Sequence, residues 1–136
     1  MTKVPKYWNQ AKKYLSKKDK TMSKLIKNYQ SPSETILTSR RDIFFSLCKS
    51  IIGQQISVAA ADSVFFRFKD KCKNKINAKN VSKLTFSQIK KCGLSRQKVL
   101  GIKSLANQIL DKSFNPKLLN KMTDEEAINY LSNLRQ

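Results

Sequence analysis

Two adjacent glutamines beside a glycine are the residues whose types and placing point most directly to chemistry. They lie in the segment IIGQQIS, residues 51–57, between two apolar stretches. Glycine lets a backbone approach another surface closely, and a glutamine amide both donates and accepts hydrogen bonds. Gln54 and Gln55 could therefore meet base edges, or fill the gap that a displaced base leaves in a duplex. The alternative is that both amides satisfy backbone groups at a tight turn.

A second candidate site is the segment CGLSRQK, residues 92–98, where a glycine turn leads into a helix. Ser95 can cap this helix, and Arg96 and Lys98 fall in its first turns. Because a helix N-terminus presents free N–H groups and partial positive charge, this segment could hold a phosphate. The alternative is an ordinary helix start with solvated charges.

The acidic residues form no convincing catalytic pair. Hydrolysis would require a carboxylate as a general base or charge stabiliser, and the chain has nine acidic residues. Most are expected at helix starts or element ends, where the helix dipole accounts for several of them, and Asp62 is expected to face solvent. The absence of histidine excludes Ser-His-Asp triads and histidine-ligated metals. We therefore assign no catalytic residue and no metal ligand, and we expect no cofactor.

The three cysteines, Cys48, Cys72 and Cys92, are spaced 24 and 20 residues apart and form no CxxC pair. Their flanking residues fit apolar helix faces, so we interpret all three as small core residues rather than as ligands or nucleophiles. An odd number of cysteines, with an N-terminus that lacks the apolar region of a secretory leader, indicates a reducing compartment.

The chain carries a large positive charge. Its 136 residues include 28 Lys and Arg against nine Asp and Glu, a net charge of +19. Nucleic acid is the commonest partner for such a field, although an AT-rich genome also enriches a protein in lysine. Apolar residues make up 40%, and we expect residues 1–136 to form a single helical domain with a buried core. Apolar runs fall far short of the ~20 residues of a membrane span, so no membrane contact is expected.

Helical periodicity runs through nearly the whole chain and predicts an all-α fold. Along residues 58–72 the apolar positions repeat at three and four residues, beginning with Val58, and should face the core. Residues 31–33 (SPS) are expected to break the chain, and residues 69–79 to form a lysine-rich loop, either solvated or in loose contact with phosphate. Helices are predicted over residues 5–17, from Asp19, and over residues 44–53, 58–72, 87–91, 96–111 and 124–136.

Helix caps are expected where Ser, Thr or Asp precedes an apolar periodic run. The predicted caps are Asp19, the pair Ser39 and Asp42, Ser57, Ser95, and the capping box of Thr123 with Glu126.

Four segments also resemble a family of DNA repair enzymes. YWNQAKKYLSKKDKTMSKLIKNY, IIGQQISVAAADSVFFRF, CGLSRQKVLGIKSLANQI and MTDEEAINYLSNLRQ follow one another in the order and spacing of that family. They resemble the helix-hairpin-helix DNA glycosylases, in the branch that excises alkylated bases, DNA-3-methyladenine glycosylase II. The resemblance runs from about Tyr7 to Gln136 and implies a helix-hairpin-helix DNA glycosylase-like helical domain.

The resemblance also implies a function in base-excision repair. The family's reaction is hydrolysis of the N-glycosidic bond of alkylated purines, carried out by a monofunctional glycosylase. Many alkylated purines are positively charged, so the bond is already weakened, and an aspartate with a stacking pocket suffices. We expect an intracellular monomer whose partner is double-stranded DNA containing alkylated bases.

The sequence departs from the family at its end. In the family, the helix matching residues 124–135 is followed by a glycine-rich hairpin of the kind GIGxWTA, which grips a DNA phosphate, and then by the catalytic aspartate. This sequence ends at Gln136, before both. The expectation is a fold incomplete at the C-terminus and a chain that is inactive by itself.

Five residues can be matched to DNA-binding positions. Gln54 and Gln55 match the turn that enters the duplex where a base has been flipped, with Gln55 at the wedge position. Ser57 starts the following helix, and Arg96 and Lys98 match a basic helix start for which we infer a DNA contact. Two alternatives stay open: a non-enzymatic basic module that binds DNA or RNA, and a helical protein whose partner covers its last helix.

Overall fold

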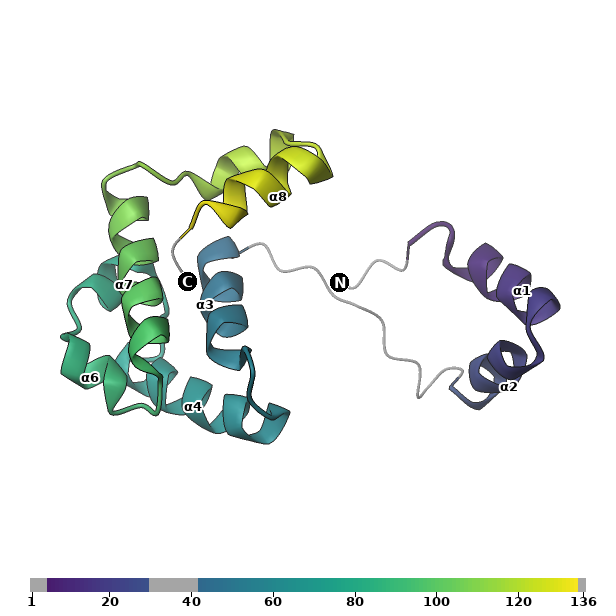
Figure 1. Ribbon diagram of the computed structural model, residues 1–136, viewed down its shortest axis with the longest axis horizontal. Helices are drawn as coiled ribbons and strands as arrows, with labels where there is room; N and C mark the ends of the chain where they lie inside the picture. Colours follow the sequence, from purple (N-terminus) through teal and green to yellow (C-terminus); the bar gives the residue numbers. More distant parts are fainter. Residues whose placement is uncertain (1–4, 30–41, 135–136) are drawn as a thin grey trace. The chain divides into compact units, whose positions relative to one another are not determined.

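The computed structural model describes residues 5–29 and 42–134, and in these ranges every regular element is a helix (Figure 1). The all-α prediction is confirmed. The chain divides into two units, Met1–Arg41 and Asp42–Gln136, and each is described by itself. The single domain over residues 1–136 stays a prediction.

The first unit holds two helices, α1 (Trp8–Lys18) and α2 (Lys20–Asn28). The second unit holds α3 (Ile43–Gly53), α4 (Val58–Lys71), α5 (Ala78–Ser82), α6 (Phe86–Lys90), α7 (Arg96–Leu110), the 3-10 helix η1 (Pro116–Lys121) and α8 (Asp124–Ser132).

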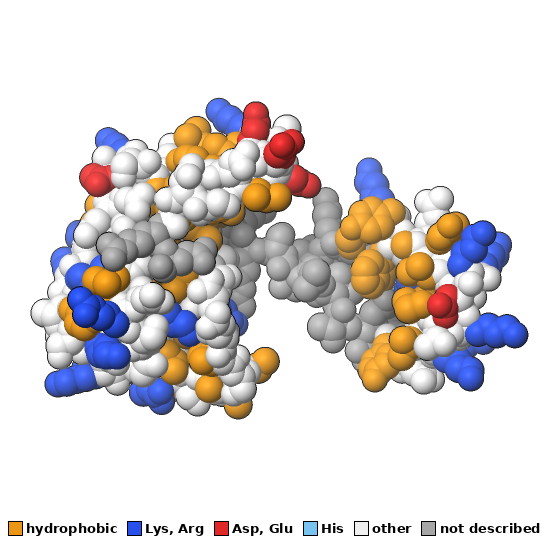
Figure 2. All heavy atoms as spheres, in the orientation of Figure 1, with side chains coloured by type: hydrophobic (Ala, Val, Ile, Leu, Met, Phe, Trp, Pro, Cys, Tyr) orange, Lys and Arg blue, Asp and Glu red, His pale blue; other side chains and the backbone are white. Residues whose placement is uncertain are grey.

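In the first unit, α1 and α2 pack against each other as a short helical pair. Asp19 lies between them, and its carboxylate accepts a hydrogen bond from the Met22 N–H at 2.9 Å, which confirms the predicted cap. Apolar side chains gather along one side of the pair (Figure 2). Neither helix contains a buried residue, so within this unit the apolar side is only partly covered.

The caps of the second unit are as predicted, with one change. Ser57 and Ser95 accept hydrogen bonds from the N–H groups three residues on, and Thr123 forms a capping box with Glu126. Asp42 caps α3 by itself, accepting from the Phe45 N–H at 3.0 Å. Its expected partner Ser39 lies outside the described residues, as does the expected break at residues 31–33.

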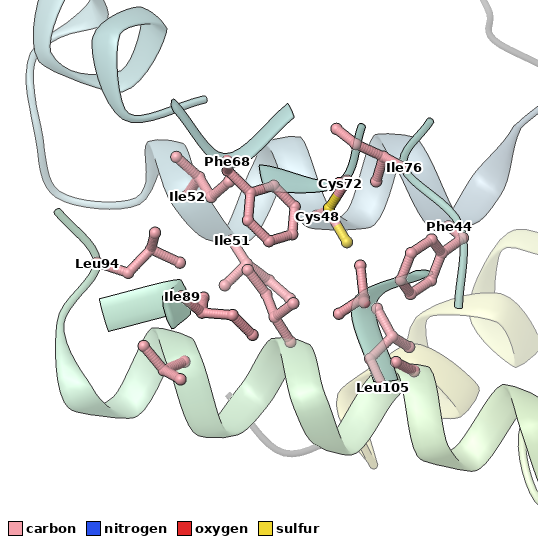
Figure 3. Close-up of a cluster of buried hydrophobic side chains, with 14 of the residues drawn as sticks. Phe44, Cys48, Ile51, Ile52, Phe68, Cys72, Ile76, Ile89, Leu94 and Leu105 are labelled. Carbon is pink, nitrogen blue, oxygen red and sulfur yellow. The ribbon is translucent and has the colours of Figure 1, made fainter. Parts of the chain in front are cut away.

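The core of the second unit is closed by α7, which contacts α3, α5 and α6. Figure 3 shows Phe68 of α4, Ile51 of α3 and Ile89 of α6 in one cluster beside α7. The inner face of α7 is almost completely buried; it consists of Val99, Ile102, Leu105 and Ala106.

The prediction that Val58 faces the core is wrong, because its side chain is 79% exposed. The buried stripe of α4 begins at Val64 and continues through Phe68 to Cys72, where α4 ends. At about 100° per residue, Val58 lies roughly 120° around the helix from Val64. The apolar first turn of α4 is therefore exposed beside the Gln54-Gln55 turn.

The lysine-rich segment 69–79 is more ordered than predicted. α4 continues to Lys71 and α5 begins at Ala78, so only five residues between the Cys72 cap and α5 are non-helical. Its lysines are exposed, but Ile76 and Ala78 are buried. Further along, the sequence pattern missed η1, and α8 ends at Ser132 with Asn133 as its C-cap rather than running to Gln136.

The three cysteines are buried free thiols, which confirms their interpretation as core residues. Burial raises the pKa of Cys72 to about 11, with the neighbouring Cys92 adding to the rise. Burial also raises the pKa of Cys48 and of Cys92. The neutral thiol is therefore the stable form of all three in the folded chain.

Replacing Gly93 should cost far more stability than replacing Gly53. Gly93 has φ +103°, and an added Cβ would lie 3.0 Å from an Arg67 nitrogen and 3.2 Å from a Val64 methyl. We expect Gly93→Ala to lower the free energy of unfolding by about 1 to 3 kcal/mol. At Gly53 the nearest such contact is 3.9 Å, so Gly53→Ala should change it by between 0 and about +1 kcal/mol. Urea denaturation of both variants measures this, and equal effects would contradict the argument.

The buried thiol of Cys72 should make stability fall at alkaline pH. Between pH 9.0, its ordinary pKa, and about 11, the unfolded chain loses a thiol proton that the folded chain keeps. The contribution is fully present below pH 9 and is lost as the pH rises toward 11. Urea denaturation of the unaltered chain is compared with that of Cys72→Val at each pH. The titration of the lysines is common to both proteins and cancels in the difference between their free energies of unfolding. A difference between the two proteins that stays constant from pH 8 to 11 would show that this thiol does not contribute.

Candidate nucleic-acid interface

Three helix ends meet around the turn that joins α3 to α4. α3 ends at Gly53, and the chain reaches the α4 cap Ser57 after three residues. Gln54 is the C-cap of α3 and has an extended backbone, with φ −61° and ψ 132°. Gln55 has φ 55°, in the left-handed region that residues with a side chain seldom adopt. Both glutamines are exposed.

Lys98 fastens the start of α7 to this turn. Its ammonium donates hydrogen bonds to the carbonyl oxygens of Ile52 at 2.8 Å and Gln54 at 2.7 Å. The last carbonyls of a helix lack partners within the helix and lie at its negative end, so an ammonium is a favourable cap. The structure thus brings the two segments of the sequence analysis together. A direct contact of Lys98 with phosphate stays a prediction.

The starts of α4 and α7 both adjoin this turn. Ser57 Oγ accepts a hydrogen bond from the Ala60 N–H at 3.2 Å, and Ser95 Oγ accepts one from the Lys98 N–H at 3.3 Å. Arg96 is the first residue of α7 and is exposed. The N-terminus of α4 follows the turn directly, and the first turn of α7 is bonded to it through Lys98, so two positive helix ends adjoin the turn, an arrangement suited to an anion.

Two hollows include residues of the turn in their linings. The larger, of about 270 Å³, lies between α3 and the start of α4 and is lined by Lys49, Gly53, Ile56, Val58, Ala61, Asp62 and Phe65. The smaller, of about 170 Å³, is lined by Leu47, Ser50, Ile51, Gln54, Leu105, Leu131 and Leu134. The turn thus contributes to two hollows that are lined mainly by apolar side chains, through Gln54 in the smaller and Ile56 in the larger.

Sequence reasoning missed two contributors to this region. Asp62 is exposed, as predicted, but it also lines the larger hollow. Arg67 was not singled out: its Nε donates to the Cys92 carbonyl at 2.8 Å and its guanidinium lies against Gly93. This bond joins residues 25 positions apart, so no local sequence pattern predicts it.

Within residues 5–29 and 42–134, no group of three or more Cys, Asp or Glu side chains could hold a metal ion. None of the helices in these ranges is both long and apolar enough to cross a membrane.

A family model for the HhH-GPD superfamily of base excision DNA repair proteins matches residues 48–134. The chain belongs to this family. The match contains the turn, the start of α7 and the core that holds them. No match was found among curated proteins.

Two solved structures have the same fold as this HhH-GPD chain. A 3-methyladenine DNA glycosylase of Schizosaccharomyces pombe, in complex with abasic DNA, has a TM-score of 0.80 and 22% identity, covering 93% of this chain and 63% of that one. A DNA-3-methyladenine glycosidase of Bacillus halodurans has a TM-score of 0.68 and 19% identity, covering 74% of this chain and 47% of that one. The chain thus spans about half to under two thirds of the length of these structures.

Removing the Lys98 ammonium should destabilise the second unit. Lys98→Met leaves two helix-end carbonyls without their charged partner, and we expect a loss of about 1 to 3 kcal/mol in the free energy of unfolding. Arg96→Met is the matched control, an exposed cation in the same helix turn, and should change stability by less than about 0.5 kcal/mol. Urea denaturation distinguishes them, and equal small losses would mean that the Lys98 bonds contribute nothing to stability.

Proposed function

We propose that this chain is the part of a DNA N-glycosylase that recognises a flipped alkylated purine in double-stranded DNA. The whole protein would hydrolyse the N-glycosidic bond of that base, with no cofactor. The observation that carries the proposal is the strained Gln54-Gln55 turn at a junction of three helix ends, within residues that match a base-excision repair family. Both similar structures are named 3-methyladenine glycosylases, and one was solved with abasic DNA, the kind of product such a reaction leaves. An intracellular, DNA-associated monomer is part of the same proposal.

Gln55 supports insertion into the duplex because its backbone is in a conformation that its side chain disfavours. A left-handed backbone costs a residue with a Cβ about 1 to 2 kcal/mol, and glycine would remove that cost. Strain of this kind is concentrated at functional sites. The exposed amide can donate and accept, so it suits the space opened opposite a flipped base.

The residues around the turn suit the phosphates next to the flipped nucleotide. Arg96 is free of any cap role and exposed, so it is our first choice for a direct contact. Ser57 and Lys98 already bind backbone groups, and we infer that they hold the helix starts whose N–H groups and dipoles attract phosphate. Gln54 joins α3 to this arrangement through its carbonyl.

Catalysis needs a group that this chain does not offer in its described part. All Asp and Glu side chains in residues 5–29 and 42–134 are exposed, and most occupy helix caps or first turns. A carboxylate that supports departure of a base is best held in a site that excludes water. We therefore expect residues 1–136 alone to bind damaged DNA without releasing the base.

The test uses the 136-residue chain on duplex DNA. Alkylated duplex should yield no abasic sites, whereas duplex containing an abasic site should bind more tightly than the intact duplex. Catalytic release of base would overturn the proposal that this chain is inactive alone. Equal binding to both duplexes would favour the second candidate function, a non-enzymatic nucleic-acid binder, which the net charge of +19 supports.

Gln55→Gly should separate stability from DNA recognition. Relief of the left-handed strain should raise the free energy of unfolding by about 1 kcal/mol. Loss of the amide should weaken binding to abasic duplex about tenfold, or ~1.4 kcal/mol, with little effect on intact duplex. Asn74→Gly is the control for the stability effect, since Asn74 has φ 60° in a different turn and its replacement changes no charge. Unchanged preference for abasic DNA in Gln55→Gly would remove Gln55 from the recognition site.

A further inference from the structure

We propose that a lysine face on the second unit binds the phosphate backbone of the duplex beyond the flipped base. The lysine face consists of Lys69, Lys71, Lys73, Lys75, Lys79 and Lys83, all of them exposed. The choice of DNA as the partner rests on the proposed function; the existence of an anion-binding face rests on the observations below.

The charge of the second unit is unevenly distributed. Residues 69–83 hold six lysines against one acidic residue, Asp70, whereas four of the unit's seven acidic residues lie between Asp111 and Glu126. Figure 2 shows acidic side chains gathered at the edge of the unit where α8 lies. Closely spaced like charges repel one another, and a polyanion that binds them removes this repulsion. A lysine-rich composition alone would enrich every surface, so the separation itself needs an explanation.

The backbone that displays these lysines is fixed. Cys72 and Ile76 are buried beneath it, so the lysines that alternate with them point outward. The Asn80 side-chain amide donates to the Lys75 carbonyl at 2.9 Å and to the Cys72 carbonyl at 3.4 Å, and Asn77 caps α5. Lys73 is itself left-handed, with φ 54°. Because the turn is already ordered, binding to a rigid duplex would cost little backbone entropy.

The lysine face is connected to the candidate site by rigid elements. α4 leads from Ser57 beside the glutamine turn to Lys71 over 14 residues, about 21 Å at 1.5 Å per residue. That length corresponds to about six base pairs of duplex. α6 packs on both α4 and α7, and its exposed end at Lys90 and Lys91 lies between the lysine face and Arg96 along the chain. A duplex held at the turn could therefore reach the lysine face.

The experiment compares two triple variants of the 136-residue chain with equal loss of charge. One replaces Lys73, Lys75 and Lys79 by Gln; the control replaces Lys112, Lys117 and Lys121 by Gln, which are exposed and lie after α7 and in η1. Binding to abasic duplex is measured over a series of salt concentrations. Each lost phosphate contact reduces the magnitude of the negative slope of log K against log salt by about 0.9. We expect the lysine-face triple to lower it by about 2 to 3, and the control by less than about 1.

Duplex length provides the second arm. A hairpin duplex of about 8 base pairs with a central abasic site extends too little to reach the lysine face, and one of about 24 base pairs extends far enough. The difference between the triples should appear only on the long duplex. Equal slopes for the two triples, or the same difference on both duplexes, would overturn the proposal.

The outcomes also separate this inference from the proposed function. Loss of preference for abasic DNA with a persistent slope difference would reject the glycosylase site and keep the lysine face. A normal preference for abasic DNA with no slope difference would keep the glycosylase site and reject the lysine face. If the lysine-face triple loses binding to vesicles of anionic phospholipid but not to the long duplex, the face serves a membrane surface and the DNA assignment is wrong.

Discussion

The burial of one face of α7 is the constraint on which the second unit depends. Val99, Ile102 and Leu105 are almost inaccessible, and they are the surface against which α3, α5 and α6 are placed. Once that face is buried, the register of α7 is fixed. Its first turn then carries Lys98 to the last carbonyls of α3, and its next turns carry Lys103 to the Leu84 carbonyl at 2.6 Å. A single hydrophobic stripe therefore positions the glutamine turn and the linker that follows α5.

Most of the fold could be read from the sequence because its determinants are local. Caps at Asp19, Ser57 and Ser95 are decided by a side chain and an N–H three residues away, and the apolar period shows which residues meet the core. Errors arise where that locality fails. Val58 has the three- and four-residue spacing of the other apolar positions but lies about 120° around α4 from the buried stripe. The turn after Cys72 is held by the Asn80 side chain, which bonds two carbonyl oxygens five and eight residues back along the chain.

The candidate site was predictable in composition but not in assembly. The residue types in segments 51–57 and 92–98 indicate the two parts of the candidate site. The bond from Lys98 to Gln54 that joins these parts spans 44 residues, so the sequence does not predict it. It also changes the interpretation of Lys98, because a lysine at a helix start was expected to seek an external anion. Among the lysines that the structure describes, a few, including Lys98 and Lys103, bind the protein's own carbonyls, and the exposed majority contribute to its external field.

The left-handed backbone at Gln55 has a consequence for how this protein would change over evolutionary time. Glycine or asparagine would suit that backbone better, so mutation followed only by selection for stability should replace the glutamine. A lineage that keeps glutamine there is being held by something other than folding. In descendants that no longer need the turn, this position should be among the first to drift, which makes it a record of whether the ancestral activity is still in use.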